Sequence, residues 1–140
     1  MKTVKVGEIS LSNKSNLVLI SGLNVLEDKF IVKEVVGELK KVSDELDIPF
    51  IFKASYDKAN RSSIESFRGP GIENGLEALK KIKSDYKVPV MSDVHSPGEV
   101  KKAKEILDVI QIPAFLCRQT DLISSAAITG LPINVKKGQF

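Results

Sequence analysis

The sequence predicts an α/β fold in which helices alternate with the strands of a parallel sheet. Short apolar runs alternate along the chain with longer segments whose apolar residues recur at steps of three and four. The short runs are almost continuously apolar, as buried parallel strands require. No linker or change in composition divides the 140 residues, so we expect a single domain over residues 1–140. The right-handed crossover rule leaves two architectures for such a chain, a closed barrel or a doubly wound open sheet.

Each expected element has its own signal in the sequence. Strands are expected at residues 17–21, 50–52, 88–91, 109–112 and 132–135. Amphipathic helices are expected over residues 32–46, 76–82, 100–107 and 122–127, with Gly130 ending the last one. We also expect a small β-hairpin at residues 4–11. The turn Ser21-Gly22-Leu23-Asn24 contains a single glycine, so the dinucleotide-binding fingerprint of a Rossmann sheet is absent.

Composition and charge narrow the classes of function. The chain is 42% hydrophobic and 28% charged, which is typical of a globular protein. Its 21 basic and 18 acidic residues give a net charge of +3, which is too balanced for a nucleic-acid or membrane surface but suits small anionic ligands. No apolar run approaches the roughly 18 residues of a membrane span. The single cysteine, Cys117, fits a reducing compartment, so we expect a cytoplasmic protein without nucleic-acid or membrane partners.

Polar residues with catalytic capacity stand where each expected strand ends. Polar residues also simply begin loops, which accounts for any one of these positions but less well for the set. In a parallel barrel the strand ends open on one face, where such enzymes build their active sites. Lys53 and Lys136 follow apolar strand residues directly, so each ammonium is expected to need a compensating anion. The full set is Asn24, Lys53, Ser55, Asp93, His95, Gln111, Lys136 and Lys137.

The loop after the second expected strand concentrates lysines, an arginine, hydroxyls and an amide within residues 53–63, and Arg68 follows. Such groups hold phosphates and carboxylates, although a solvated basic loop is the alternative. Gly69-Pro70-Gly71 is expected to be a rigid turn, because no phosphate-loop spacing surrounds it. Asp93 and His95 are two residues apart and are expected to face the barrel interior together, although a lone histidine is more often structural.

Several motifs of this chain resemble one enzyme family. Residues 52–63, Phe-Lys-Ala-Ser-Tyr-Asp-Lys-Ala-Asn-Arg-Ser-Ser, are similar to the signature of the 3-deoxy-D-manno-octulosonate 8-phosphate synthases, also called 2-dehydro-3-deoxyphosphooctonate aldolases. Segments 22–27, 92–95, 111–121 and 133–140 resemble the same family and arrive in its order. The resemblance covers essentially the whole chain and is weakest near its start.

The resemblance implies a (β/α)8 barrel, the TIM barrel, of which this chain supplies about the first five strands. It implies a homotetrameric transferase that joins phosphoenolpyruvate to D-arabinose 5-phosphate and releases inorganic phosphate. The product, 3-deoxy-D-manno-octulosonate 8-phosphate, belongs to lipopolysaccharide biosynthesis, and no cofactor is implied.

The resemblance also implies roles for individual residues. Lys53, Lys58 and Lys136 would surround the carboxylate and phosphate of phosphoenolpyruvate, while Asn60, Arg61 and Ser62 would hold the pentose phosphate. Asp93 and Gln111 would line the reacting region, and Arg118 would reach a phosphate in a neighbouring subunit's site. The implied catalytic set is Asn24, Lys58, Asp93 and Lys136, and Ser55, His95 and Phe115 complete the substrate-binding set.

The family contains metal-dependent and metal-independent members, and the metal-dependent ones carry a cysteine where this chain has Asn24. An amide is a poor ligand for the metals that a thiolate selects. Cys117 lies in another motif and does not replace the missing ligand. We therefore expect a metal-independent protein without a metal site.

Two alternatives to the synthase remain. The first comes from the length of the chain, because a complete barrel needs about 250 residues. Further substrate-contacting residues of the family have no counterpart in these 140 residues. The chain could be an inert half-barrel that binds phosphosugar or assembles with another chain, and we expect it to be inactive by itself. An aldolase that uses Lys53 or Lys136 as a Schiff base is a third hypothesis, but the continuous match over residues 53–63 argues against it.

Overall fold

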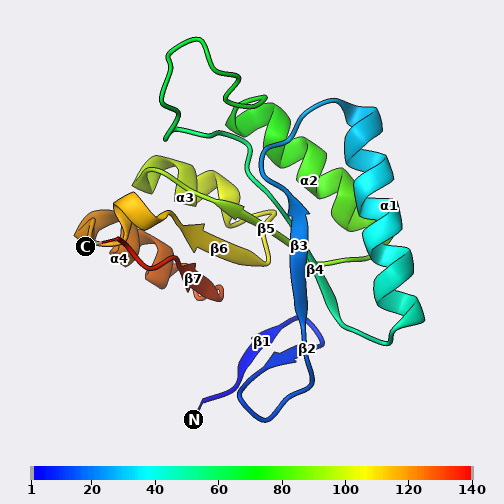
Figure 1. The fold of residues 1–140 in the computed structure, drawn as a ribbon. Helices are drawn as coiled ribbons and strands as arrows, with labels where there is room; N and C mark the ends of the chain where they lie inside the picture. The colour runs from blue at the N-terminus through cyan, green and yellow to red at the C-terminus, as the bar shows by residue number, and fades with distance from the viewer. Residues whose placement is uncertain (1, 140) are drawn as a thin grey trace.

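The computed structural model describes residues 2–139. It contains a two-stranded antiparallel hairpin and a five-stranded parallel sheet with the strand order β3-β4-β5-β6-β7 (Figure 1). Over this part of the chain, no helix is long and apolar enough to cross a lipid bilayer.

The hairpin predicted for residues 4–11 is confirmed. Its strands are β1 (Val4–Val6) and β2 (Ile9–Leu11), and Val6 pairs with Ile9. Gly7 in the connecting turn has a φ of 55°, which glycine adopts without a Cβ clash.

Strands and helices alternate along the rest of the described chain, as predicted. The parallel strands are β3 (Leu19–Leu23), β4 (Phe50–Ala54), β5 (Val90–Asp93), β6 (Val109–Ile112) and β7 (Ile133–Val135). The helices are α1 (Lys29–Glu45), α2 (Ile72–Tyr86), α3 (Pro97–Ala103) and α4 (Thr120–Ile128), with a short 3-10 helix η1 (Ala114–Leu116) that was not predicted.

Local signals explain where the helices begin and end. The Asp28 carboxylate accepts a hydrogen bond from the Phe30 N–H and caps α1. Ser96 caps α3 in the same way, and Pro97 occupies its first turn, where no N–H is needed. Gly130, with a φ of 75°, follows the last turn of α4 and ends it as predicted.

Several predicted boundaries differ from the observed ones by two to four residues; β4, for example, continues to Ala54, two residues past its predicted end. β3 begins at Leu19, where pairing with Phe50 of β4 starts, and Leu17 before it is 72% exposed. β5 begins at Val90 because Pro89 has no N–H to donate to a strand ladder. α3 ends at Ala103, four residues before the predicted end at residue 107. As a consequence Lys53 and Asp93 lie inside β4 and β5, where the sequence had placed them just after the strands.

The two faces of the parallel sheet are covered by different elements. The outer face carries Phe52 and Ile110, and each of the four α-helices packs on it through buried residues. These include Val36, Leu79, Ala103 and Leu122. The inner face carries Ile51, Met91 and Val109, which pack against Val6 of the hairpin. Burying each such side chain stabilises the fold by about 1.5–3 kcal/mol.

This arrangement selects the barrel over the open sheet. The strands follow one another in sequence order without a reversal, and all four α-helices lie on the same face. A doubly wound sheet would reverse its strand order and carry helices on both faces. The fold is the first part of a (β/α)8 barrel, with the hairpin at the amino-terminal ends of the strands (Figure 1).

Candidate active site

A polar layer occupies the inner face of the sheet at the carboxyl ends of the strands, above the apolar layer that packs on the hairpin. It consists of Lys53 on β4, Asp93 on β5, Gln111 on β6 and Asn134 on β7. Asp93 pairs in register with Gln111, whose Oε1 accepts a hydrogen bond of 2.9 Å from Asn134 Nδ2. Because the strands are parallel, loops that leave their ends open on this one side.

Lys53, Ser55 and Asp93 form a buried charged cluster. Lys53 Nζ lies 3.4 Å from Asp93 Oδ1 and donates a 2.8 Å hydrogen bond to Ser55 Oγ, whose hydroxyl in turn donates to Asp93 Oδ1. The side chains of Lys53 and Asp93 are only 18% and 7% exposed. The compensating anion predicted for Lys53 is therefore the protein's own Asp93.

Asp93 stays ionised in this setting. Burial disfavours the carboxylate, but hydrogen bonds from His95 and Ser55 and the charge of Lys53 outweigh it, so the pKa of Asp93 lies well below its usual range. Asp93 is thus a fixed negative charge at neutral pH, able to orient its partners or accept a proton but not to donate one.

His95 lies on the same side as Asp93, as predicted, although β5 has ended before it. His95 Nε2 is 3.3 Å from Asp93 Oδ2, and Nδ1 is 3.1 Å from Glu99 Oε2. Burial alone would lower the pKa of His95, but its hydrogen bonds to Asp93 and Glu99 raise it to about 9. Tyr56 OH donates a 2.6 Å hydrogen bond to the same oxygen of Glu99.

Tyr56 and Glu99 are the two residues of this cluster that the sequence analysis missed. Glu99 had a detectable signal, because Ser96 followed three residues later by Glu99 is the pattern of a helix capping box. Its carboxylate reaches back past the cap and accepts a 2.9 Å hydrogen bond from the His95 N–H. Tyr56 belongs to the quoted loop motif but had no signal of its own.

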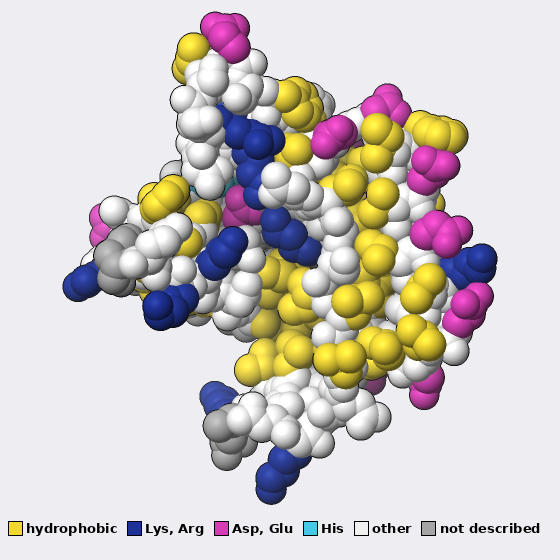
Figure 2. Space-filling view, in the orientation of Figure 1, with side chains coloured by type: hydrophobic (Ala, Val, Ile, Leu, Met, Phe, Trp, Pro, Cys, Tyr) yellow, Lys and Arg dark blue, Asp and Glu magenta, His cyan; other side chains and the backbone are white. Residues whose placement is uncertain are grey.

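Cations without acidic partners gather beside this cluster. The pKa of Lys58 is lowered, first by partial burial and then by the charge of Lys53; the charge of Asp93 opposes the shift, and Lys136 and Arg61 add to it. These four residues therefore share one electrostatic environment. No carboxylate among residues 2–139 lies within ion-pair distance of Lys58, Arg61 or Lys136. Figure 2 shows Lys and Arg side chains gathered between the loop that follows β4 and the apolar inner face.

The two arginines of the loop between β4 and α2 have different hydrogen-bond partners. Arg68 binds both carboxylate oxygens of Asp57, through Nε at 2.9 Å and Nη2 at 2.6 Å. Arg61 donates only through Nε, to the Phe67 carbonyl at 3.1 Å. Its neighbours Asn60 and Ser62 are exposed. The loop thus presents the Arg61 guanidinium and two small polar groups to solvent.

The segment Gly69-Pro70-Gly71, predicted to be a rigid turn, packs closely against the backbone of Tyr56. Gly69 has a φ of 120°, and a Cβ there would lie 2.4 Å from the Tyr56 carbonyl oxygen. The Gly71 N–H donates a 3.1 Å hydrogen bond to that same carbonyl. The turn therefore holds the backbone of Tyr56 in place.

The remaining predicted site residues lie at the margin. Asn24 follows β3, is exposed, and lines a shallow pocket of about 380 Å³ with Lys53 and Gln111. Phe115 is 60% exposed and Arg118 is also exposed; within residues 2–139 no hydrogen bond or ion pair joins either to the cluster. No group of three His, Cys, Asp or Glu residues in the described chain is placed to hold a metal ion.

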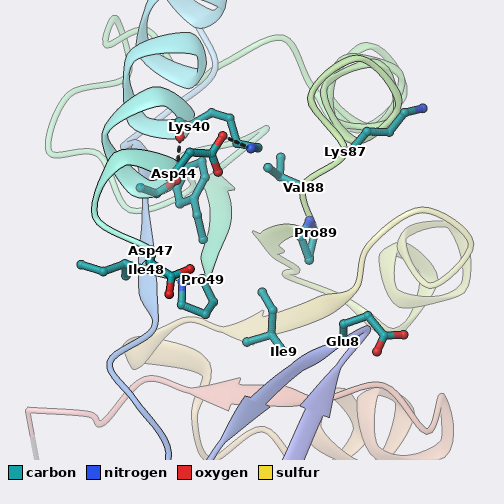
Figure 3. A pocket seen from close by; sticks show the side chains of 12 residues that line it. Glu8, Ile9, Lys40, Asp44, Asp47, Ile48, Pro49, Lys87, Val88 and Pro89 are labelled. Carbon is teal, nitrogen blue, oxygen red and sulfur yellow. Dashed lines mark hydrogen bonds and ion pairs between the residues drawn. The ribbon is translucent and has the colours of Figure 1, made fainter.

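A second pocket, of about 430 Å³, lies at the opposite ends of the strands (Figure 3). It is lined by Glu8 and Ile9 of the hairpin and by Pro49 and Pro89, which precede β4 and β5. Its Lys40 side chain is already paired with Asp44. Barrel enzymes place their chemistry at the carboxyl ends of the strands, so the cluster around Asp93 is the candidate active site.

Comparisons with known proteins agree with this placement of the chain among barrel enzymes. Residues 2–140 match the family model described as the DAHP synthetase I family. A protein of Fusobacterium nucleatum named 2-dehydro-3-deoxyphosphooctonate aldolase is 53% identical over 137 residues, which are 98% of this chain and 49% of that protein. Proteins of the same name from Prochlorococcus marinus and Hahella chejuensis are 52% and 50% identical over 139 residues, covering 99% of this chain and 49% and 50% of theirs.

These matches confirm the resemblance inferred from the motifs. The chain spans about half the length of the curated relatives it matches. The family model, in contrast, covers all but the first residue, and the observed fold is the one the family predicts. The chain belongs to the DAHP synthetase I family.

Proposed function

We propose that the protein joins phosphoenolpyruvate to D-arabinose 5-phosphate, giving 3-deoxy-D-manno-octulosonate 8-phosphate and inorganic phosphate. The observation that carries the proposal is the convergence of Lys58, Arg61 and Lys136, none of them neutralised by a described carboxylate, beside the Lys53–Asp93 pair. Two anionic substrates need such a concentration of fixed positive charge to lie side by side. The names of the relatives select this reaction among those that use phosphorylated substrates.

Phosphoenolpyruvate would bind over the ends of β4 and β7. Lys53, Lys58 and Lys136 would contact its carboxylate and phosphate as point charges. The lowered pKa of Lys58 supports this role, because its causes are partial burial and then the charge of Lys53, and a bound anion would offset both by stabilising the ammonium.

The pentose phosphate would bind to the loop after β4. Arg61 would take the phosphate through its two terminal nitrogens, and Asn60 and Ser62 would add neutral donors. Arg68 would take no part, because Asp57 already occupies its guanidinium.

The reacting carbons would meet above the polar layer of the sheet. C3 of phosphoenolpyruvate attacks the sugar aldehyde while water adds at C2, so negative charge develops on the aldehyde oxygen. That oxygen takes up the proton that the added water loses, and the C2–O bond to phosphate then breaks to leave the C2 ketone and inorganic phosphate. Fixed donors such as Lys58, Lys136 and protonated His95 would stabilise that charge. Asp93 and Gln111 would orient the groups around the reacting atoms, with Ser55 holding Lys53 and Asp93 together. Asn24 and Phe115 would border the site.

The proposal extends to assembly, metal use and location. We propose a homotetramer, in which the exposed Arg118 reaches a phosphate in a neighbouring subunit's site. The amide of Asn24 at the end of β3 supports metal independence, since a thiolate is expected there in metal-dependent members. Cys117 as the single cysteine supports a cytoplasmic location.

The test is product formation by the purified natural-length protein. Phosphate release and the eight-carbon acid should appear only when both substrates are present, and chelation should not reduce the rate. A shorter aldose phosphate should be a poorer substrate, because the phosphate would no longer reach the Arg61 loop. Absence of product, with both substrates still bound, would instead support the inert phosphosugar-binding half-barrel. Loss of turnover on chelation, restored by a divalent metal, would contradict metal independence.

A further inference from the structure

His95 lies between two carboxylates that come from different elements. Asp93, the last residue of β5, faces Nε2 at 3.3 Å, and Glu99, in the first turn of α3, faces Nδ1 at 3.1 Å. The His95 side chain is 14% exposed, so water cannot easily replace either partner. A neutral imidazole carries one N–H and one lone pair, so one of its nitrogens would face a carboxylate oxygen without a proton between them.

We propose that Glu99 is a positioning residue that keeps His95 as an imidazolium, with its Nε2 hydrogen directed at Asp93. An imidazolium donates through both nitrogens and so satisfies both carboxylates at once. Its place in catalysis rests on the function proposed above, whereas the clamp itself rests only on the geometry.

Glu99 is itself held from several sides, so it can fix the ring. Its Oε2 accepts hydrogen bonds from the His95 N–H at 2.9 Å and from Tyr56 OH at 2.6 Å. The Tyr56 ring is buried and stands edge-on to the imidazole, with centroids 6.0 Å apart. A Cβ at Gly75 of α2 would lie 2.2 Å from the Tyr56 Cβ, so α2 packs directly against this side chain.

The charged groups around His95 support the doubly protonated ring. Asp93 and Glu99 are the anions that face it, and hydrogen bonds from His95 and Tyr56 outweigh burial to hold the pKa of Glu99 below its ordinary value. Tyr56 stays protonated, because burial and the hydrogen bond to Glu99 raise the pKa of its hydroxyl far above the usual range. Lys53 is the cation nearest to Asp93. Two cations and two anions therefore balance within the cluster, and the site keeps one charge state through neutral pH.

The test is the titration of the His95 ring in the natural-length protein. Protein labelled with 15N-histidine reports the protonation of both ring nitrogens, and the signal that is lost in His95→Gln is assigned to His95. We expect His95 to be doubly protonated at neutral pH with a midpoint near 9. In Glu99→Gln the midpoint should fall by about one pH unit or more, because a charged hydrogen-bond partner is lost. A wild-type midpoint at or below 6.5, the ordinary value, would overturn the proposal.

The matched control is Glu105→Gln, which removes the same charge beyond the end of α3 from a side chain that is 71% exposed. It should leave the midpoint unchanged; an equal shift in both variants would mean that overall charge and not the clamp sets the protonation of His95. If Glu99→Gln does not fold, Tyr56→Phe still tests the geometry, because the ring must remain doubly protonated while Glu99 is present.

Steady-state kinetics of Glu99→Gln test whether His95 takes part in catalysis. If kcat depends on the imidazolium, the wild type should lose activity as the pH rises through about 9, and in Glu99→Gln that loss should move to lower pH together with the His95 midpoint. KM for either substrate should change less than kcat, because Glu99 does not itself reach the cations that bind them. A shifted titration with an unaltered pH profile would retain the clamp and remove His95 from the reaction. A failure of the proposed reaction would leave the titration result intact.

Discussion

Asp93 connects the two halves of the candidate site. Its Oδ1 lies beside Lys53 Nζ and accepts a hydrogen bond from the Ser55 hydroxyl, and its Oδ2 faces His95 Nε2. Through His95 the network continues to Glu99 and from there to Tyr56. The buried charges of Lys53, Asp93, His95 and Glu99 thus compensate one another, whereas Lys58, Arg61 and Lys136 have no carboxylate partner among residues 2–139. Fully partnered buried groups of this kind are rigid, and that rigidity suits a site whose substrates must be aligned.

The protonation of His95 makes the stability of the protein depend on pH. Its pKa rises from 6.5 in the unfolded chain to about 9 in the folded one, so its contribution is complete below pH 6.5 and is lost as the pH rises through 9. The shift corresponds to at most about 3 to 4 kcal/mol, and it contributes less than this because the ring is partly exposed to solvent. The difference in free energy of unfolding between the wild type and His95→Gln, measured by denaturant titration, should therefore shrink as the pH rises from 6.5 to about 9. A difference that grew with pH would contradict the assignment.

Arg61 and Arg68 offer a matched test of the loop. Arg61→Ala should raise KM for arabinose 5-phosphate roughly ten- to a hundredfold, since a charge-assisted contact contributes about 1.5–3 kcal/mol. KM for phosphoenolpyruvate should change little. Arg68→Ala removes the same charge from a guanidinium that Asp57 already holds, so any effect should fall on both substrates alike. Equal losses for both substrates in Arg61→Ala would show that the subsites are assigned wrongly.

At this scale the sequence indicates which polar residues stand at the strand ends but not how they pair. Lys53, Asp93, His95 and Gln111 were predicted from position alone, and the structure brings them together. The partnership of Tyr56 with Glu99 joins positions 43 residues apart and depends on how α2 and α3 pack, which no local pattern encodes. For the same reason the sequence suggested an external anion for Lys53, whose partner is in fact Asp93 on the next strand.

At the scale of elements, α2 supports the site through its contact with Tyr56. Gly75 is buried, and a Cβ there would lie 2.2 Å from the Tyr56 Cβ and 3.2 Å from its Cα. Gly37 lies on α1, where a Cβ would meet its nearest neighbour, the Tyr86 ring, at 4.0 Å. The two helices therefore contain one glycine that packing requires and one that it does not.

Alanine at these two glycines should have opposite effects on stability. Gly75→Ala should lower the free energy of unfolding by about 1–3 kcal/mol, because backbone or Tyr56 must move. Gly37→Ala should raise it by about 0.5–1 kcal/mol, because alanine is the better helix former and has room. Both are measured by denaturant unfolding of the natural-length protein. A Gly75→Ala variant as stable as the wild type would mean that α2 does not fix Tyr56.

The elements themselves were largely predictable, and their ends were not. Apolar periodicity identified each strand and each α-helix, because one buried face is enough to set that pattern. The ends depend on single groups such as Pro89, which cannot join a ladder, and on the exposure of Leu17. The short helix η1 has too few residues to show any period.

At the scale of the molecule, the order of the strands determines where the candidate active site lies. Consecutive parallel strands with every α-helix outside leave the inner face to the hairpin at one end and to polar residues at the other. Sequence patterns left the open sheet as an alternative, because they do not specify which face a helix covers. The family resemblance and the packing of all four α-helices on one face exclude it.

The 140-residue chain by itself should show no measurable synthase activity. Within the described residues β3 and β7 do not pair with each other, so the sheet is not closed and the polar layer is open to water on one side. A displacement of about 1 Å in a reacting group can cost on the order of a hundredfold in rate. Phosphate release by the 140-residue chain with both substrates present checks this. Turnover at about 1 per second or faster, typical of enzymes, would contradict it.

The position of bound phosphoenolpyruvate in the natural-length protein tests the central claim most directly. A crystal structure of that complex should place carboxylate and phosphate oxygens about 2.7–3.2 Å from the Nζ atoms of Lys53, Lys58 and Lys136, at the carboxyl ends of the strands. Phosphoenolpyruvate bound instead in the pocket beside Lys40 and Pro89, or anywhere away from these three lysines, would contradict the assignment of the site.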